Sequence, residues 1–244
     1  ASDVYKRQMT NWTARLAVIS GGLSEESSTH RLAQLLSDAV VESARKQGSE
    51  VVVERIDLRA LAHDITTASL TGFAPPALAD AYEVLGAADA VVAVTPTYKA
   101  SFTGLFKSFW DATAGGVLSG VPVIVGATGG SARHSLVTDT ALRPLFAYMK
   151  ALVMPTAVYA APDDWARRGL EARASEAADE LTQQLERMLG GADVVVNGGS
   201  DARVSKNGEA PRTSSNSVRT LAETRNRARD PFVAVPTMEE MLHG

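Results

Sequence analysis

The sequence predicts an α/β protein with a parallel sheet that carries helices on both faces. Short apolar runs rich in β-branched residues alternate with amphipathic segments of helical spacing over residues 15–189, and this alternation is typical of βαβ units. Three of the apolar runs end in loops rich in Ser, Thr and Gly. Ligands bind beyond the carboxyl ends of the strands in such sheets, so these loops are the candidate site.

Composition narrows the class of function. The 244 residues include 45% hydrophobic residues, enough for one large core. The net charge is -4 and the basic residues are scattered, so nucleic acid is not an expected partner. No run approaches the roughly 18 apolar residues of a membrane span. The chain has no Cys, which excludes thiolate chemistry and favours a cytoplasmic location, and its four His lack metal-ligand spacing, so no metal site is predicted.

Three regions are expected along the chain. Residues 1–14 are interpreted as a leader outside the fold, and residues 15–189 as the folded domain. Residues 190–244 are rich in Gly, Ser, Asn and Arg and predict a flexible tail. Its apolar end, residues 231–242, is expected to dock as an anchor.

The hydrophobic pattern places five strands and five helices. The strands are expected at residues 15–20, 50–58, 90–95, 121–127 and 154–160. The helices are expected at residues 28–47, 77–88, 104–111, 138–150 and 163–189. Residues 59–76 show no regular pattern. This alternation predicts a parallel sheet with right-handed crossovers. We expect a flavodoxin-like three-layer sandwich whose parallel five-stranded sheet has the order 2-1-3-4-5.

The first polar loop, residues 20–29 (SGGLSEESST), leads directly into a helix. Free backbone N–H groups and hydroxyls at a helix N-terminus suit a phosphate. Ordinary capping by Ser or Thr is the alternative. Neither G-x-x-x-x-G-K-[ST] nor G-x-G-x-x-G is present, and Glu25 and Glu26 oppose an anion unless both point into solvent.

The other two polar loops offer a surface for a flat ring. Residues 95–103 supply a proline, a tyrosine and hydroxyls, and residues 128–134 supply two glycines that let the backbone approach a flat ligand. A simple tight turn is the alternative for the glycine pair. In the order 2-1-3-4-5 the three strands that carry polar loops are adjacent, so their loops meet. A phosphorylated molecule with a flat aromatic head fits this layout, and FMN is the candidate.

These three segments resemble the NAD(P)H-dependent FMN reductase family. The resemblance covers about residues 15–189, and its most specific part is residues 95–111 (TPTYKASFTGLFKSFWD). The tail is similar to that of the actinobacterial branch, whose members supply reduced flavin to luciferase-like monooxygenases. Many relatives carry an arginine in the first loop, where this sequence has Ser24, Glu25 and Glu26. That departure leaves phosphate binding to hydroxyls and backbone N–H groups.

The resemblance implies FMN as cofactor, NADPH or NADH as hydride donor, and a homodimer or homotetramer. The phosphate would be held by Ser20, Ser27, Ser28 and Thr29, with Leu23 packing nearby. The ring would be lined by Pro96, Thr97, Tyr98, Lys99 and Ser101. Its other side would face Thr128, Gly129, Gly130 and Ser131. Hydride transfer is the cofactor's own chemistry, so no catalytic residue is named.

The predicted function is reduction of FMN by NAD(P)H, with reduced flavin passed to a partner monooxygenase. One alternative keeps the fold but reduces a quinone or azo dye. Another is a non-enzymatic electron carrier, although the absence of aromatic residues from the third loop favours a reductase. Phe106, Phe109 and Trp110 are interpreted as core or subunit-interface residues. His134 is interpreted as a helix-terminal hydrogen-bonding group, with a role at the nicotinamide as the alternative.

Overall fold

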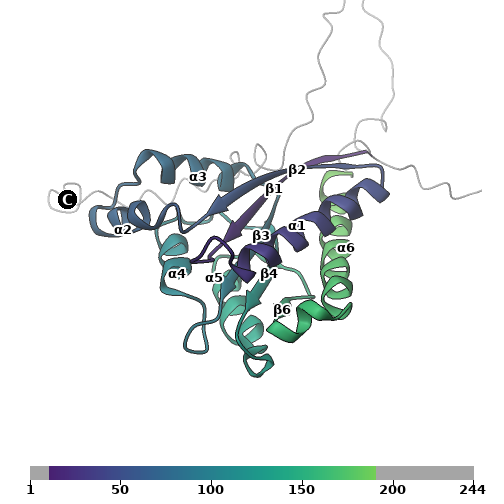
Figure 1. Cartoon of the computed structure of the whole chain (residues 1–244). Helices are drawn as coiled ribbons and strands as arrows, with labels where there is room; N and C mark the ends of the chain where they lie inside the picture. The colour runs from purple at the N-terminus through teal and green to yellow at the C-terminus, as the bar shows by residue number, and fades with distance from the viewer. Residues whose placement is uncertain (1–10, 191–244) are drawn as a thin grey trace, which may run out of the picture.

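A computed structural model describes residues 11–190 and contains one parallel sheet between two layers of helices (Figure 1). The predicted order is confirmed, because the sheet runs β2-β1-β3-β4-β5 with β6 also paired to β4. The strands are β1 (Thr13–Ser20), β2 (Glu50–Asp57), β3 (Ala90–Pro96), β4 (Pro122–Thr128), β5 (Leu152–Val153) and β6 (Val158–Ala160). β3 and β4 are buried along their whole length, as expected for strands covered on both faces.

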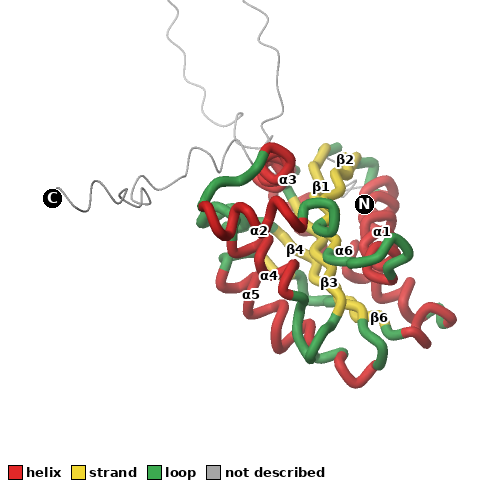
Figure 2. Tube along the Cα trace, turned by 60° about the vertical axis from the view of Figure 1, so that its left-hand side comes forward, coloured by secondary structure: helices red, strands yellow, loops and turns green. Residues whose placement is uncertain are grey.

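The helices include every predicted one and an additional α2. They are α1 (Ser28–Lys46), α2 (Ala62–Thr71), α3 (Pro76–Ala87), α4 (Gly104–Asp111), α5 (Arg143–Tyr148) and α6 (Gly169–Leu189). α1 and α6 cover one face of the sheet and α2 to α5 the other, as Figure 2 also shows. α2 was not predicted because only Ile65 and Ala68 of this helix are buried, and two residues do not make a recognisable apolar stripe. Within residues 11–190 no helix is long and apolar enough to cross a membrane.

Two predicted helices begin irregularly. Residues 138–142 form a π-helical turn, η2, before α5 starts at Arg143. Residues 162–166 form a 3₁₀ turn, η3, and α6 starts only at Gly169. A third short turn, η1, spans Ala132–His134 after β4.

The predicted fifth strand is two short strands on the same edge. β5 pairs with Pro122 and Val123, β6 pairs with residues 126–128, and both run parallel to β4. Pro155 lies in the gap and has no N–H for the ladder. The Thr156 N–H is satisfied instead by Oε2 of Glu180 at 2.8 Å. The edge strand beside β4 is therefore interrupted at Pro155 and Thr156, where Glu180 replaces the strand-to-strand hydrogen bond.

The first strand begins two residues earlier than predicted, at Thr13. Trp12 is 5% exposed and belongs to the core under α1 and α6, and its carbonyl accepts a hydrogen bond from the Glu50 N–H at 3.0 Å. Residues 11–14 of the predicted leader thus carry contacts of the folded domain. Residues 1–10 and the predicted tail from residue 191, with its anchor, lie outside the described residues.

Aromatic residues of α4 fill the core on the face covered by α2 to α5. Phe106, Phe109 and Trp110 are each at most 3% exposed, so the core interpretation of these residues is confirmed. The Trp110 ring meets Phe146 edge-on with centroids 5.0 Å apart. A Cβ at Gly21 would lie 3.2 Å from Phe106 Cδ2, so this cluster also supports the loop after β1.

We predict that Phe106→Ala lowers the free energy of unfolding by about 3–5 kcal/mol, because it leaves a cavity between α4 and the sheet. Urea unfolding followed by circular dichroism measures this change. Lys107→Ala on the same helix is the control and loses only an exposed ion pair with Asp111, worth about 0.3–0.5 kcal/mol. Equal losses in the two variants would contradict the packing assigned to Phe106.

Candidate functional site

The three polar loops meet at the carboxyl ends of β1, β3 and β4, as predicted. The Gly21 N–H donates to the Val94 carbonyl at 2.8 Å, and the Thr97 N–H donates to the Thr128 carbonyl at 2.7 Å. The hydroxyls of Thr29 and Thr128 lie 2.8 Å apart and share a buried hydrogen bond. Residues about a hundred positions apart are thus joined directly, and the loops form one surface.

The loop after β1 combines a helix cap with an unpaired hydroxyl. Ser27 Oγ accepts from the Thr29 N–H at 3.1 Å and caps α1, so the capping interpretation is confirmed for this residue. Ser28 is exposed, and Leu23 is 42% exposed. Ser20, in contrast, is 6% exposed, and its Oγ has no hydrogen-bond partner among residues 11–190. Burying a hydroxyl without a partner costs about 1–3 kcal/mol, so Ser20 is a candidate ligand contact.

Gly22 lets this loop fold closely onto the start of α1. A Cβ there would lie 2.5 Å from Ser27 Oγ and 3.1 Å from His30 Cδ2, which is too close for any other residue type without movement. The capping hydroxyl and the first turn of α1 therefore lie directly under the loop.

Two basic side chains near the first loop, Arg59 and His30, were not predicted as part of the site. Arg59 follows β2 and forms an ion pair with Glu25 at 3.6 Å, and His30 Nε2 lies 3.8 Å from Asp57 Oδ1. The Glu25 side chain is 87% exposed, so it lies largely in solvent, as a phosphate site would require. Arg59 could have been predicted near this loop, because it follows the end of β2 by two residues and β2 lies next to β1. The end of β2 therefore lies beside the first loop, although no polar loop was predicted after that strand.

The loop after β3 holds Tyr98 in a strained turn. The backbones of Tyr98 and Ser101 exchange hydrogen bonds of 2.9 and 3.1 Å. Lys99 and Ala100 between them have φ values of 52° and 64°, in the left-handed region that costs a non-glycine residue about 1–2 kcal/mol. The turn leaves Tyr98 53% exposed. Strain of this kind clusters at ligand-binding loops.

The loop after β4 is fixed in part by a hydrogen bond from Tyr159 of β6. The Tyr159 hydroxyl donates to the Ser131 carbonyl at 2.8 Å, and the Gly129 N–H donates to the Ala160 carbonyl at 3.2 Å. Burial raises the pKa of Tyr159, which keeps this donor protonated. Sequence reasoning missed Tyr159 because the predicted fifth strand ended in no polar loop.

The remaining predicted residues of these two loops have defined positions. Pro96 ends β3, and Thr97 Oγ1 is buried without a partner among the described residues. Gly130 is exposed, and the Ser131 hydroxyl accepts from the Arg133 N–H at 3.2 Å. His134 is exposed, and its backbone N–H donates to the Ser131 carbonyl at 3.4 Å.

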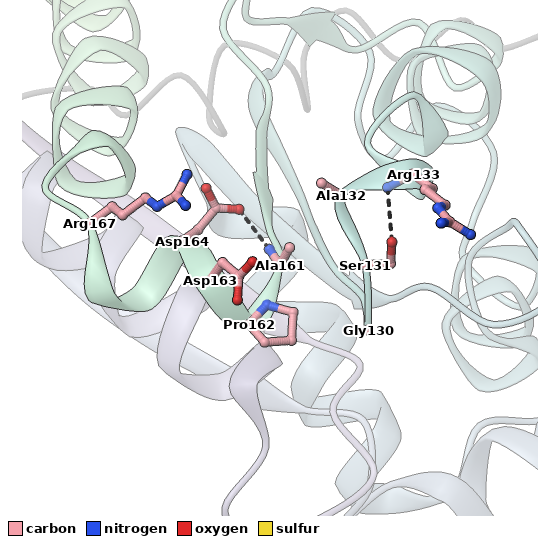
Figure 3. Close-up of a pocket in the computed structure, with 9 residues that line it drawn as sticks. All are labelled: Gly130, Ser131, Ala132, Arg133, Ala161, Pro162, Asp163, Asp164 and Arg167. Carbon is pink, nitrogen blue, oxygen red and sulfur yellow. Dashed lines mark hydrogen bonds between the residues drawn. The ribbon is translucent and has the colours of Figure 1, made fainter.

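A groove of about 450 Å³ opens beside the loop after β4 (Figure 3). Residues 130–133 form one wall and residues 161–164 with Arg167 form the other. Asp164 is engaged in this wall: it accepts from the Ala161 N–H at 2.8 Å and from Arg173 at 3.2 Å. These two contacts, the Ala161 N–H above all, lower the pKa of Asp164.

Comparison with known proteins assigns the family. The model of the NADPH-dependent FMN reductase family matches residues 14–166, which include all three loops. The chain belongs to this family. The resemblance noted in the sequence is therefore confirmed.

Relatives of this reductase family member include two proteins of Pseudomonas putida. The NADH-dependent FMN reductase SfnF is 36% identical over 152 residues, which cover 62% of this chain and 80% of SfnF. The NADH-dependent FMN reductase SfnE is 32% identical over 177 residues, covering 72% of this chain and 92% of SfnE.

Solved structures have the same fold. An oxidoreductase from Corynebacterium diphtheriae is 43% identical with a TM-score of 0.70, covering 72% of this chain and 98% of its own. The apo form of the NADH:FMN oxidoreductase EmoB is 26% identical with a TM-score of 0.61, covering 70% of this chain and 89% of its own. Both confirm the predicted flavodoxin-like architecture.

We predict that Gly129→Ala weakens FMN binding and lowers the free energy of unfolding by about 1–3 kcal/mol, because the new Cβ would lie 2.1 Å from the Tyr159 hydroxyl. Gly130→Ala is the matched control for the change in stability, since nothing lies within 4 Å of its Cβ. Urea unfolding and flavin fluorescence titration measure the two effects.

The clash also predicts coupling between the two positions. In a Tyr159→Phe background the hydroxyl is gone, so Gly129→Ala should cost less there than in the parent protein. Equal costs in both backgrounds would show that Tyr159 does not set the path of this loop.

Proposed function

We propose that this protein reduces FMN with NAD(P)H and releases the reduced flavin to an acceptor. The observation that carries the proposal is the buried Ser20 hydroxyl, which has no hydrogen-bond partner within residues 11–190 and lies where three loops converge, in a member of the NADPH-dependent FMN reductase family. When bound, FMN supplies the hydride-accepting chemistry, and the protein supplies binding and orientation.

The phosphate end of FMN fits the loop after β1. A phosphate carries acceptor oxygens that would satisfy the buried Ser20 hydroxyl, and the positive end of the α1 dipole favours its charge. The proposed contacts are Ser20, Ser27, Ser28 and Thr29, with Leu23 alongside. Within the described residues, Thr29 already bonds Thr128 and Ser27 caps α1, so these two fix the shape of the loop as well.

The ring of FMN fits the two later loops. Pro96, Thr97, Tyr98, Lys99 and Ser101 would line one side, with Tyr98 flanking the ring. Thr128, Gly129, Gly130 and Ser131 would lie along the other. No aromatic side chain projects from residues 128–131, so one face of the ring stays open to a nicotinamide. This open face favours a reductase over an electron carrier, which would cover both faces.

The charged and basic side chains near the first loop favour FMN that binds reversibly and leaves after reduction. Arg59 and His30 face Glu25 and Asp57, so each is already opposed by a carboxylate. The phosphate would then be held by hydroxyls and N–H groups without a strong cationic clamp. Such a site suits FMN that leaves after reduction, and a flavin-dependent monooxygenase is the proposed acceptor. Assembly as a homodimer or homotetramer stays a prediction.

An anaerobic titration of the protein and excess FMN with NADH or NADPH tests this function. We expect the flavin absorbance to bleach over many turnovers with at least one dinucleotide. Bound FMN that neither dinucleotide bleaches would contradict the proposal and support a carrier. Turnover of a quinone without turnover of excess FMN would instead support the quinone reductase alternative.

A further inference from the structure

We propose that Arg59 exchanges its ion pair with Glu25 for the phosphate of FMN, so that Glu25 competes with FMN for this arginine and weakens its binding. The inference rests on the proposed function and adds a pair of residues that sets the affinity of the phosphate site. Arg59 is not among the predicted flavin contacts, and it follows β2 rather than one of the three strands that carry polar loops. The pair therefore tunes how readily flavin leaves.

The backbone of Arg59 is fixed beside the end of β1. The Leu58 N–H donates to the Ser20 carbonyl at 3.1 Å, and Leu58 is fully buried. The Arg59 N–H donates to Asp57 Oδ1 at 3.0 Å. Arg59 thus directly follows the residue that bonds Ser20, whose own hydroxyl is buried without a partner among the described residues. The guanidinium already reaches the loop after β1, because its Nη2 lies 3.6 Å from Glu25 Oε1.

Glu25 lies at the exposed corner of a tight turn. The Ser27 N–H donates to the Ser24 carbonyl at 3.2 Å, which places Glu25 and Glu26 at the two central positions of the turn. The Glu25 side chain is 87% exposed and that of Arg59 is 45% exposed. An ion pair this exposed contributes little to stability, because water screens it and both side chains lose freedom in forming it. At 3.6 Å it is also too long for a hydrogen bond, so it is easily exchanged for a stronger contact.

The phosphate of FMN is a stronger partner for Arg59 than Glu25 is. A phosphate monoester carries a charge of about −1.5 to −2 at pH 7 and three acceptor oxygens, whereas a carboxylate carries a single charge. A guanidinium presents a planar fork of N–H donors that matches two phosphate oxygens. Beside Ser20, which is 6% exposed, solvent also screens the attraction less than it does at Glu25. Arg59 therefore favours the phosphate, and the loss of the Glu25 contact reduces the net gain.

Two neighbouring side chains do not enter this exchange. His30 Nε2 lies 3.8 Å from Asp57 Oδ1, so this basic group faces a carboxylate of its own. Glu26 is exposed and forms no ion pair within residues 11–190. It lies in the same turn as Glu25 and carries the same charge, but it does not hold Arg59. Glu26 is therefore the natural control for Glu25.

The first test measures the Kd of the full chain for FMN and for riboflavin, which lacks the phosphate, by flavin fluorescence titration. Glu25→Gln should tighten FMN binding about fivefold and Arg59→Gln should weaken it about fivefold, as expected for one exposed charge contact. Riboflavin binding should not change in either variant. Glu26→Gln is the matched control and should change FMN binding by less than about twofold. If the ion pair only keeps the loop in shape, Glu25→Gln would weaken FMN binding or leave it unchanged, and the proposal would be wrong.

The second test separates release of Arg59 from simple repulsion between Glu25 and the phosphate. In an Arg59→Gln background Glu25 has no arginine to hold, so Glu25→Gln should change FMN binding there by less than about twofold. The same tightening in both backgrounds would show that Glu25 acts by repulsion alone and would contradict the exchange. Stopped-flow measurement of FMN dissociation adds a kinetic readout, and Glu25→Gln should release FMN more slowly than the parent protein.

Failure of this inference and failure of the proposed function are distinguishable. Both tests use oxidised flavin without a nicotinamide, so their outcome does not depend on turnover. If FMN is turned over but the Glu25 and Arg59 variants bind it as the parent does, the exchange is wrong and the reductase function stands. If neither dinucleotide reduces FMN, the proposed function fails, and the titrations still decide whether Arg59 contacts the phosphate.

Discussion

The buried hydrogen bond between the hydroxyls of Thr29 and Thr128 is the contact on which the geometry of the site depends. It spans 2.8 Å and ties the first turn of α1 to the end of β4, across the end of β3 that lies between them. Both side chains are at most 2% exposed, so no water competes for the bond. The loop proposed for the phosphate and the loop proposed for the ring are therefore held at a fixed separation before any ligand arrives.

The loops after β1 and β4 are supported by packing, whereas the loop after β3 has a strained backbone. The loop after β4 rests on the Tyr159 hydroxyl, and the loop after β1 rests on Gly22 packed against Ser27. The loop after β3 instead carries two non-glycine residues in the left-handed region and an exposed Tyr98. Local strain is concentrated where a ligand would contact the protein, while the flanking loops are fixed by packing. Such a division suits a site that must admit and release flavin.

Most of the fold could be predicted from the sequence, because strong periodicity marks the strands and helices and right-handed crossovers leave few arrangements of parallel strands. The short run of residues 90–95 is rich in valine, which favours a buried strand, and Gly48 follows the end of α1 as expected. The split of the fifth strand was not predicted, since it depends on Glu180 of a distant helix bonding Thr156. α2 was missed because its burial comes from two residues only.

The site was predictable where a loop follows its strand directly and was missed where a contact arrives from another element. The three predicted loops do come together, but Tyr159 lies on β6 and Arg59 follows β2, strands whose ends carried no polar signal. Ser27 illustrates a different limit. The same residue type caps a helix or contacts a phosphate, and only the hydrogen bond to the Thr29 N–H shows that capping is among its roles.

The most direct test of the account compares FMN with riboflavin, which lacks the phosphate, in the parent protein and in Ser20→Ala. The account predicts that the parent binds FMN at least 100-fold more tightly than riboflavin. Ser20→Ala should weaken FMN binding about tenfold or more, leave riboflavin binding unchanged, and not lower the free energy of unfolding, because the hydroxyl has no partner among the described residues. Equal affinities of the parent for the two flavins, or unchanged FMN binding by Ser20→Ala, would contradict a phosphate site at the end of β1.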